Sequence, residues 1–335
     1  MDKSPDSPDS SATYRFAIIG GGLTATSMIC QLVDELQRQG DSGVRIGSLL
    51  AVEIFEKHLE MGPGMPHNPL YVRPFHVTNM CAKDMAVRIS RPDEFQRWVA
   101  ENGASLSRRF SQSELDDSAH TGGDERCTHY PREIMGEYLK NQFDDAVARG
   151  KRLGLSIKVR NRCEVVDLRS HGSEIYLTTA MDQRKEVGPF QGALLATGHW
   201  FESRQCENYF SSPWPAQHLR SAIPPGAAVG VIGSSLSALE TALTLTADGQ
   251  FRRLDSGKLT YEKPETSRTL SLFSRRGLVP QVRGRIGSRP NRYFTCARLH
   301  ALIDDHQGQV RLKEIFDLLD RELCEAYGET IDWHQ

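Results

Sequence analysis

The sequence lacks three features that would each point to a particular class of protein. It has no apolar run close to the roughly 20 residues that a membrane-spanning helix needs, and none of its seven cysteines forms a C-x-x-C pair. Its formal net charge is only -2, so no general attraction to nucleic acid or to an acidic membrane is expected. These absences argue against a membrane helix, a zinc site and a dithiol redox centre, and they predict reduced, packed cysteines.

The N-terminus also lacks the basic start and apolar stretch of a secretory signal. Residues 1–13 are rich in Ser, Pro and Asp, which predicts a disordered tail on a cytoplasmic protein. The length of 335 residues suits two domains. We expect the first domain over residues 14–222 and a second, which need not be complete, over residues 223–335.

A strand, a glycine turn, a helix and a second strand open the chain. Residues 14–19 form an apolar run, residues 23–37 have helical periodicity, and residues 49–55 form the next apolar run. The polar, glycine-containing stretch between them, residues 38–47, is predicted to be a loop. This order predicts the α/β fold class with a parallel sheet.

The glycine turn fits the dinucleotide-binding pattern G-x-G-x-x-G/A. It reads Gly20-Gly21-Gly22-Leu23-Thr24-Ala25 and lies between a strand and a helix, as the pattern requires. Gly20 permits the tight turn, Gly22 lets a pyrophosphate approach the backbone, and Ala25 lets helix and strand pack. Glu56 ends the next strand, where a carboxylate can bind a ribose diol. The sequence therefore predicts a dinucleotide site here.

The rest of the first half alternates between predicted loops and regular elements. The segment 60–80 reads as a long ordered loop and the segment 105–126 as a mobile one. Two amphipathic helices are expected over residues 92–101 and 131–149. The segment 155–180 alternates as two or three antiparallel strands do. A further strand ends in a tight turn at residues 192–198, and the Pro-rich stretch 213–225 is expected to be a linker.

Several short motifs resemble those of known flavoproteins. Ile54-Phe55-Glu56-Lys57 followed by Gly62-Pro63-Gly64 resembles FAD enzymes with two dinucleotide-binding domains. The strings from His76 to Met80 and from Tyr130 to Leu139 resemble the bacterial FAD/NAD(P)-binding family of uncharacterised flavoproteins. That family is similar to N-hydroxylating and other flavin-containing monooxygenases, which share the turn Ala196-Thr197-Gly198. The resemblance runs from about Tyr14 to about Trp333.

The resemblance implies two Rossmann-like dinucleotide-binding domains, an FAD domain with a β-meander and an NADPH domain. The residues implied to bind FAD are Gly20, Gly22, Leu23, Thr24, Ala25, Glu56, Lys57, Asn79, Arg132, Val165, Thr197 and Gly198. Among these, Arg132 is implied to lie near the flavin or its pyrophosphate, and Val165 to contact the adenine through its backbone. A surface salt bridge is an equally weighted alternative for Arg132. For His67 and His76, packing of the loop is favoured over catalysis.

A second, weaker fingerprint follows a strand at residues 229–232. It reads Gly233-Ser234-Ser235-Leu236-Ser237-Ala238, with Ser235 in the place of the middle glycine. The added Cβ stands where a pyrophosphate should approach, although the Ser235 hydroxyl could donate to phosphate. A nucleophilic serine is the weaker alternative, because the string is not G-x-S-x-G.

Two arginines indicate which nucleotide the second fingerprint binds. Arg275 and Arg276 follow a strand predicted at residues 270–273, where NAD-specific domains usually carry an acidic residue. Paired guanidinium groups can hold a 2′-phosphate, so NADPH is predicted. The later arginines are expected to form a solvated basic face, and no aromatic ladder for nucleic acid accompanies them. These are Arg283, Arg285, Arg289, Arg292 and Arg298.

The resulting functional prediction is an enzyme in which NADPH reduces FAD and the reduced flavin acts on oxygen or on a small-molecule substrate. A monooxygenase is favoured, with a flavin reductase or dehydrogenase as the alternative enzyme and a non-catalytic nucleotide-binding protein as the second hypothesis. No catalytic residue, substrate or oligomeric state is assigned, and no metal is expected. No returning Gly-Asp motif follows the predicted helix at residues 311–327. This predicts a fragment, a shortened relative or a partly open flavin site that releases hydrogen peroxide.

Overall fold

The computed structural model describes residues 13–110, 128–180, 184–199, 206, 208–280 and 290–333. It divides into two compact units, Met1–Val279 and Pro280–Gln335. The predicted tail, apart from its last residue, and most of the predicted mobile segment 105–126 lie outside the described residues. The domain boundary predicted at 222/223 falls inside the first unit, and it stays a prediction.

The first unit opens as the sequence predicts. Strand β1 (Tyr14–Ile19) is followed by helix α1 (Leu23–Arg38) and strand β2 (Leu50–Phe55). The predicted loop at 38–47 is wrong, because helix α2 (Asp41–Ser48) occupies most of it. A Cβ on Gly43 would collide with the backbone of Leu36. The glycine that indicated a loop is therefore needed for close helix packing.

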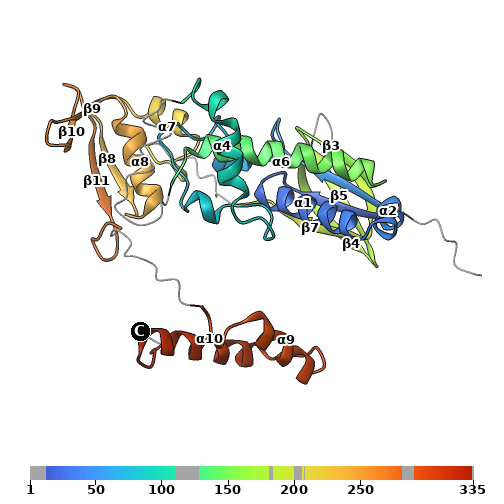
Figure 1. The fold of residues 1–335 in the computed structure, drawn as a ribbon. Helices are drawn as coiled ribbons and strands as arrows, with labels where there is room; N and C mark the ends of the chain where they lie inside the picture. Colours follow the sequence, from blue (N-terminus) through green and yellow to red (C-terminus); the bar gives the residue numbers. More distant parts are fainter. Residues whose placement is uncertain are drawn as a thin grey trace, which may run out of the picture. The chain divides into compact units, whose positions relative to one another are not determined.

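The first unit contains a four-stranded parallel sheet next to α1 (Figure 1). Its order is β3-β2-β1-β7, with β3 (Ser156–Arg160) and β7 (Gly192–Leu195) at the edges. Successive side chains of a strand point to opposite faces. Ile18 accordingly belongs to one buried apolar cluster, with α1 and the long helix α6 (Arg132–Arg152). Its neighbours Ala17 and Ile19 belong to another cluster.

An antiparallel meander packs against that second face. It consists of β4 (Glu164–His171), β5 (Glu174–Ala180) and β6 (Arg184–Phe190), paired in that order. Leu177 and Phe190 of the meander lie in the cluster that contains Ala17 and Ile19. The alternation over residues 155–180 thus predicted the antiparallel strands β4 and β5 correctly. It was wrong for residues 156–160, because β3 pairs in parallel with β2, and β6 is an addition.

The segments between these elements carry shorter helices. The loop predicted at 60–80 contains α3 (Gly64–His67), and η1 (Ala82–Asp84) follows it. Helix α4 (Glu94–Leu106) confirms the amphipathic helix predicted over residues 92–101. Helix α7 (Ala216–Ala222) lies within the predicted Pro-rich linker, which is therefore not purely a linker. It packs against α8 (Leu236–Thr246), the helix of the second fingerprint.

The second fingerprint also has the predicted strand–turn–helix order. Strand β8 (Ala228–Ile232) precedes helix α8 (Leu236–Thr246), and β8 pairs in parallel with β11 (Thr269–Phe273). An antiparallel hairpin, β9 (Gln250–Arg253) and β10 (Leu259–Glu262), stands between them in the sequence. The sequence did not predict this hairpin, because its strands are charged and mostly exposed.

The second unit contains helices α9 (Cys296–Asp305) and α10 (Leu312–Tyr327). Within it, Glu322 accepts hydrogen bonds from the backbone of Arg292, Tyr293 and Phe294 at 2.6–3.1 Å. The Arg292 side chain forms an ion pair with Glu325 at 2.6 Å. Arg292 is therefore exposed, as expected for a solvated basic face, and it also forms an ion pair within this unit.

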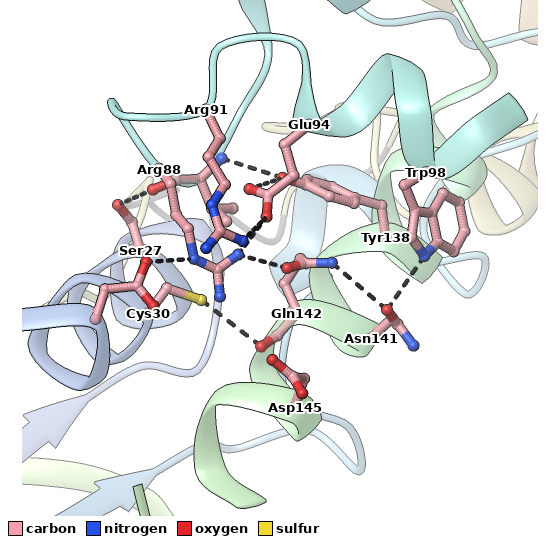
Figure 2. Close-up of polar contacts among 12 residues, drawn as sticks. Ser27, Cys30, Arg88, Arg91, Glu94, Trp98, Tyr138, Asn141, Gln142 and Asp145 are labelled. Atoms are coloured by element: carbon pink, nitrogen blue, oxygen red, sulfur yellow. Dashed lines mark hydrogen bonds and ion pairs between the residues drawn. The ribbon is translucent and has the colours of Figure 1, made fainter. Parts of the chain in front are cut away.

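A buried ion network ties α1 to α6 (Figure 2). The side chain of Arg88 is almost completely buried, and its Nε donates to Asp34 of α1 at 2.8 Å. Its Nη1 donates to Glu94 of α4 and to Gln142 of α6, each at 2.5 Å. Tyr138 of α6 donates to the other oxygen of Glu94 at 3.0 Å. The network holds together two helices whose N-termini carry predicted site residues.

One cysteine departs from the expected reduced state. Cys81 is disulfide-bonded, whereas Cys30 and Cys163 are free and buried. Burial raises the pKa of the Cys30 thiol to about 12, so this thiol is uncharged at neutral pH and packs as a small apolar side chain.

Candidate nucleotide-binding sites

The first glycine turn is fixed by backbone contacts with two strands. Gly20 has a φ of +102° and donates from its backbone N to the carbonyl of Phe55 at 2.8 Å. A Cβ on Gly20 would collide with the carbonyl oxygen of Ala196. The predicted Ala196-Thr197-Gly198 turn therefore touches the fingerprint directly. Only glycine satisfies both the positive φ and this contact.

Two glycines from distant parts of the chain face each other next to this turn. A Cβ on Gly22 would lie 3.4 Å from the Cα of Gly64, and a Cβ on Gly64 would lie 3.2 Å from the Cα of Gly22. Gly22 is also the N-cap of α1 and provides no side-chain cap. The first-turn residues Leu23 and Thr24 are exposed. Gly22 and Gly64 thus present backbone without a side chain at a helix N-terminus, which fits a pyrophosphate.

Glu56 lies where the fingerprint requires a carboxylate. Its Oε2 accepts from the backbone N of Gly21 at 2.7 Å, and its Oε1 accepts from the backbone N of His58 at 2.8 Å. The side chain is buried, whereas the neighbouring Lys57 is exposed. Carboxylate oxygens have several lone pairs, so both oxygens keep acceptor capacity for a ribose hydroxyl.

Val165 lies close to the same segment through the start of the meander. The backbone N of Cys163 donates to the carbonyl of Glu56 at 2.8 Å. Two residues later, Val165 packs against the apolar cluster that contains Ile19 and Phe55. The structure thus brings the predicted adenine-side residue next to the ends of β1 and β2. Ala25 is fully buried at the helix–sheet contact, as predicted.

Arg132 is not a surface salt bridge, because it is only 8% exposed. Its Nε donates to the carbonyl of Val77 at 3.0 Å, and its Nη2 donates to Oδ1 of Asn79 at 2.9 Å. The same Nη2 forms an ion pair with Oε1 of Glu240 at 2.5 Å. The structure therefore brings together Arg132 and Asn79, two of the residues predicted to bind FAD, and adds an acidic partner from α8.

Two histidines near Arg132 are held neutral. Burial, with the Arg132 charge as a smaller contribution, lowers the pKa of His67 to about 4. Burial lowers the pKa of His76 to about 4 as well. His76 receives a hydrogen bond from the backbone N of Arg73 at 3.1 Å, and its Nε2 lies 3.1 Å from Oγ1 of Thr244. The favoured interpretation of His76 as a packing residue agrees with these contacts.

Glu240 and Thr244 are the site residues that sequence reasoning missed. Both lie on α8, and both reach residues of the first half of the chain. The available signal was weak: Glu240 is the one acidic residue in an otherwise apolar and hydroxyl-bearing helix. An acidic side chain is normally solvated, so its buried position could not be expected from the helix alone.

The second fingerprint borders a hollow that is lined by several of the residues predicted to bind NADPH. Gly233 has a φ of +111°, and its backbone N donates to Phe273 at 2.7 Å. Ser235 is the N-cap of α8, and its side chain makes no capping hydrogen bond. Ala238 is buried. The hollow has a volume of about 500 Å³ and is lined by Ser234, Ser274, Arg275, Arg276 and Leu278.

The arrangement of this hollow suits a phosphorylated ribose. Arg275 and Arg276 are exposed directly after β11, beside the turn that follows β8. Ser234 is held in place because its hydroxyl donates to the carbonyl of Leu278 at 2.5 Å. Two cations and a helix N-terminus thus meet at the carboxyl ends of parallel strands, where nucleotides bind in such sheets.

Within the described part of the chain, no group of three or more His, Cys, Asp or Glu side chains could hold a metal ion. No helix within the same residues is long and apolar enough to cross a membrane.

Comparisons with known proteins agree with this geometry. The uncharacterized protein YdhS of Escherichia coli (strain K12) is 27% identical over 273 residues, which are 80% of this chain and 46% of YdhS. The chain thus spans about half the length of that curated relative. The ornithine N-hydroxylase KtzI of Kutzneria sp. 744 has a TM-score of 0.51 at 16% identity, covering 95% of this chain and 70% of KtzI. At 16% identity, this similarity shows a shared fold alone.

A second solved structure is more distant. The lysine monooxygenase NbtG of Nocardia farcinica has a TM-score of 0.40 at 13% identity, over 70% of this chain and 58% of that chain. A family model described as FAD-NAD(P)-binding matches residues 17–200 of this chain. This match confirms the predicted family and the FAD and NAD(P) cofactors, and the KtzI likeness confirms the predicted fold of two Rossmann-like domains. Because the model covers more than half of the sequence, the chain belongs to the FAD-NAD(P)-binding family.

Proposed function

We propose that this chain is an NADPH-dependent, FAD-containing oxidoreductase of the monooxygenase type. The observation that carries the proposal is that one compact unit contains two glycine turns, each opening a helix without a side-chain cap. Only the second turn lies beside paired arginines. When bound, FAD supplies the chemistry of accepting a hydride and of reacting with oxygen.

The first turn holds the adenosine and pyrophosphate half of FAD. Gly22 and Gly64 leave the backbone bare at the N-terminus of α1, where the helix dipole favours phosphate. Glu56 accepts a ribose hydroxyl while it stays fixed by the backbone of Gly21 and His58. The neighbouring contacts come from the remaining members of the first site, Gly20, Leu23, Thr24, Ala25, Lys57, Val165, Thr197 and Gly198.

The second turn holds NADPH. The hydroxyl of Ser235 replaces the missing middle glycine as a donor to the pyrophosphate. Arg275 and Arg276 bind the 2′-phosphate, which NADH does not have. Gly233 makes the turn tight enough for this approach, with its positive φ and its bond to Phe273.

Arg132 and Asn79 act on the flavin side of the site. The guanidinium orders the flavin loop, which we define as residues 60–80, through the carbonyl of Val77 and the amide of Asn79. Because His67 and His76 are neutral above about pH 4, Arg132 is the cation among these side chains at neutral pH. It is placed to balance negative charge on a reduced cofactor.

Multiple-turnover NADPH oxidation separates the proposal from its alternatives. A monooxygenase-type enzyme consumes NADPH repeatedly in air but stops after one turnover under nitrogen. A flavin reductase or dehydrogenase resumes turnover under nitrogen when an artificial electron acceptor is added and shows little oxygen-dependent activity. A non-catalytic protein binds FAD and consumes no NADPH in either atmosphere. We expect the first pattern, and either of the others would contradict the proposal.

A further inference from the structure

One face of α8 contacts the flavin loop and the start of α6. Oε1 of Glu240 lies 2.5 Å from Nη2 of Arg132, and Oγ1 of Thr244 lies 3.1 Å from Nε2 of His76. Glu240 and Thr244 are four residues apart, so they project from the same side of the helix. Their two partners are themselves joined, because the backbone N of Arg132 donates to the carbonyl of His76 at 2.7 Å. The four residues form one connected contact.

The contact is buried. Glu240 is 9% exposed and His76 is 1% exposed. Burial raises the pKa of Glu240, and the neighbouring Arg132 charge opposes that rise. A buried charge whose partner is removed is strongly unfavourable. The carboxylate and the guanidinium therefore depend on each other.

The contact joins Glu240 to Arg132 through one carboxylate oxygen and is not a bidentate ion pair. Within the part of the chain that the structure describes, Oε2 of Glu240 has no hydrogen-bond partner. Arg132 divides its donors between Glu240 and the flavin loop residues Val77 and Asn79. A two-point Arg–carboxylate pair would be more rigid. A shift of α8 would thus be transmitted to the flavin loop through one guanidinium.

We propose that Glu240 and Thr244 are positioning residues, which fix the nucleotide helix α8 against the flavin loop and thereby set the approach of the nicotinamide to the flavin. Ser235 is the N-cap of this helix, and Glu240 lies about 7.5 Å further along the helix axis at 1.5 Å per residue. A rigid helix anchored there keeps its first turn, and the pyrophosphate bound to it, in register with the flavin. This inference rests on the proposed function.

The test uses substitutions in the FAD-loaded protein. Glu240→Ala removes the ion pair, Glu240→Gln keeps an oxygen that can accept from Arg132, and Thr244→Val removes the hydroxyl at nearly constant volume. Thr246→Val is the matched control, because the Thr246 hydroxyl bonds only to carbonyls of its own helix. Rapid mixing under nitrogen measures flavin reduction at saturating NADPH, and titration gives the NADPH Kd. Reduction by dithionite measures the rate at which the flavin is reduced when no nucleotide is present.

Glu240→Ala should lower the NADPH reduction rate about tenfold or more, since small misplacements of reacting groups have large effects. Glu240→Gln should recover part of that rate, and Thr246→Val should be unaffected. FAD content, dithionite reduction and NADPH Kd should change little. An unchanged NADPH reduction rate in both Glu240→Ala and Thr244→Val would overturn the inference, as would equal losses of NADPH and dithionite reduction.

Hydrogen exchange provides a readout that needs no NADPH. The backbone N of Thr78 donates to Tyr130 at 2.9 Å, and that of Arg132 donates to His76 at 2.7 Å. Both amides should exchange faster in Glu240→Ala than in wild type or Thr246→Val. If wild-type flavin is not reduced by NADPH, the proposed function fails, and exchange alone decides whether Glu240 anchors the loop. Unchanged exchange in Glu240→Ala would overturn that anchoring.

Discussion

At the residue scale, Gly22 allows a sharp test of the first site. A single Cβ there meets Gly64 at 3.4 Å, which is an ordinary contact, whereas the branches of valine extend into the space assigned to the pyrophosphate. Gly22→Val should therefore fold but purify colourless, with FAD affinity reduced about tenfold or more. Gly22→Ala is the control and should retain more FAD. Stoichiometric FAD in Gly22→Val would show that the site is misplaced.

Arg275 and Arg276 should determine the choice between NADPH and NADH. A charge-assisted contact contributes roughly 1.5–3 kcal/mol, so Arg275→Ala/Arg276→Ala should lower the NADPH preference by about tenfold or more. The ratio of flavin reduction rates with the two nucleotides measures the preference. Arg252→Ala removes an exposed arginine that pairs with Glu262 and should leave the ratio unchanged. Equal preference in wild type and double variant would contradict the assignment of the hollow.

His76 should make the folded state sensitive to mild acid. Its pKa falls from 6.5 to about 4 on folding, chiefly through burial, so the unfolded chain binds the proton more readily between these values. The contribution of His76 to stability is therefore complete above about pH 6.5 and is lost as the pH falls toward 4. Urea unfolding of wild type and His76→Gln over this range measures it. The variant should show the weaker pH dependence, and identical slopes would refute the prediction.

At the scale of elements, the Arg88 network should be a major determinant of how α1 and α6 stay together. Arg88→Met leaves Asp34 and Glu94 without their buried guanidinium. Removing one partner of a buried pair costs about 3–5 kcal/mol, and urea unfolding would measure this loss. Arg97→Met is the control, because Arg97 pairs with Asp93 on the surface and should cost about 0–1 kcal/mol. Similar losses in the two variants would contradict a special role for Arg88.

The elements differ in how far the sequence predicts them. Strand β1, α1 and β2 were predictable, because apolar periodicity and a glycine turn are local signals. Helix α2 was not, because its glycines are required by contacts with Leu36 and Leu153, which only the folded chain brings close. The hairpin β9–β10 carries few buried side chains, so it lacks the alternating pattern by which strands are predicted.

The candidate sites follow the same division. Gly20, Gly22 and Glu56 could be proposed from the sequence because the chemistry of pyrophosphate and ribose binding fixes their spacing near one turn, and their role in binding FAD stays a prediction. The partnership of Arg132 with Glu240 was not found, because it joins two helices of different halves of the chain. The contact of His76 with Thr244 likewise spans 168 residues. Such pairs depend on how the two halves of the chain pack together, and a local sequence pattern carries no information about that packing.

At the scale of the whole molecule, both proposed nucleotide sites lie within the first compact unit, Met1–Val279. That unit contains both glycine turns, the hollow at Arg275 and Arg276, and the contact between Arg132 and Glu240. Every described residue that we assign to either site belongs to this unit. We therefore expect residues before 280 to be sufficient for electron transfer.

Anaerobic titration of the purified protein with NADPH shows most directly whether NADPH reduces FAD bound to this chain. The protein should be yellow from bound FAD, and about one equivalent of NADPH per flavin should bleach it, because a hydride carries both electrons that the flavin accepts. NADH at the same concentration should bleach it more slowly. A protein that takes up no FAD, or one whose bound FAD keeps its colour with excess NADPH, would contradict the account.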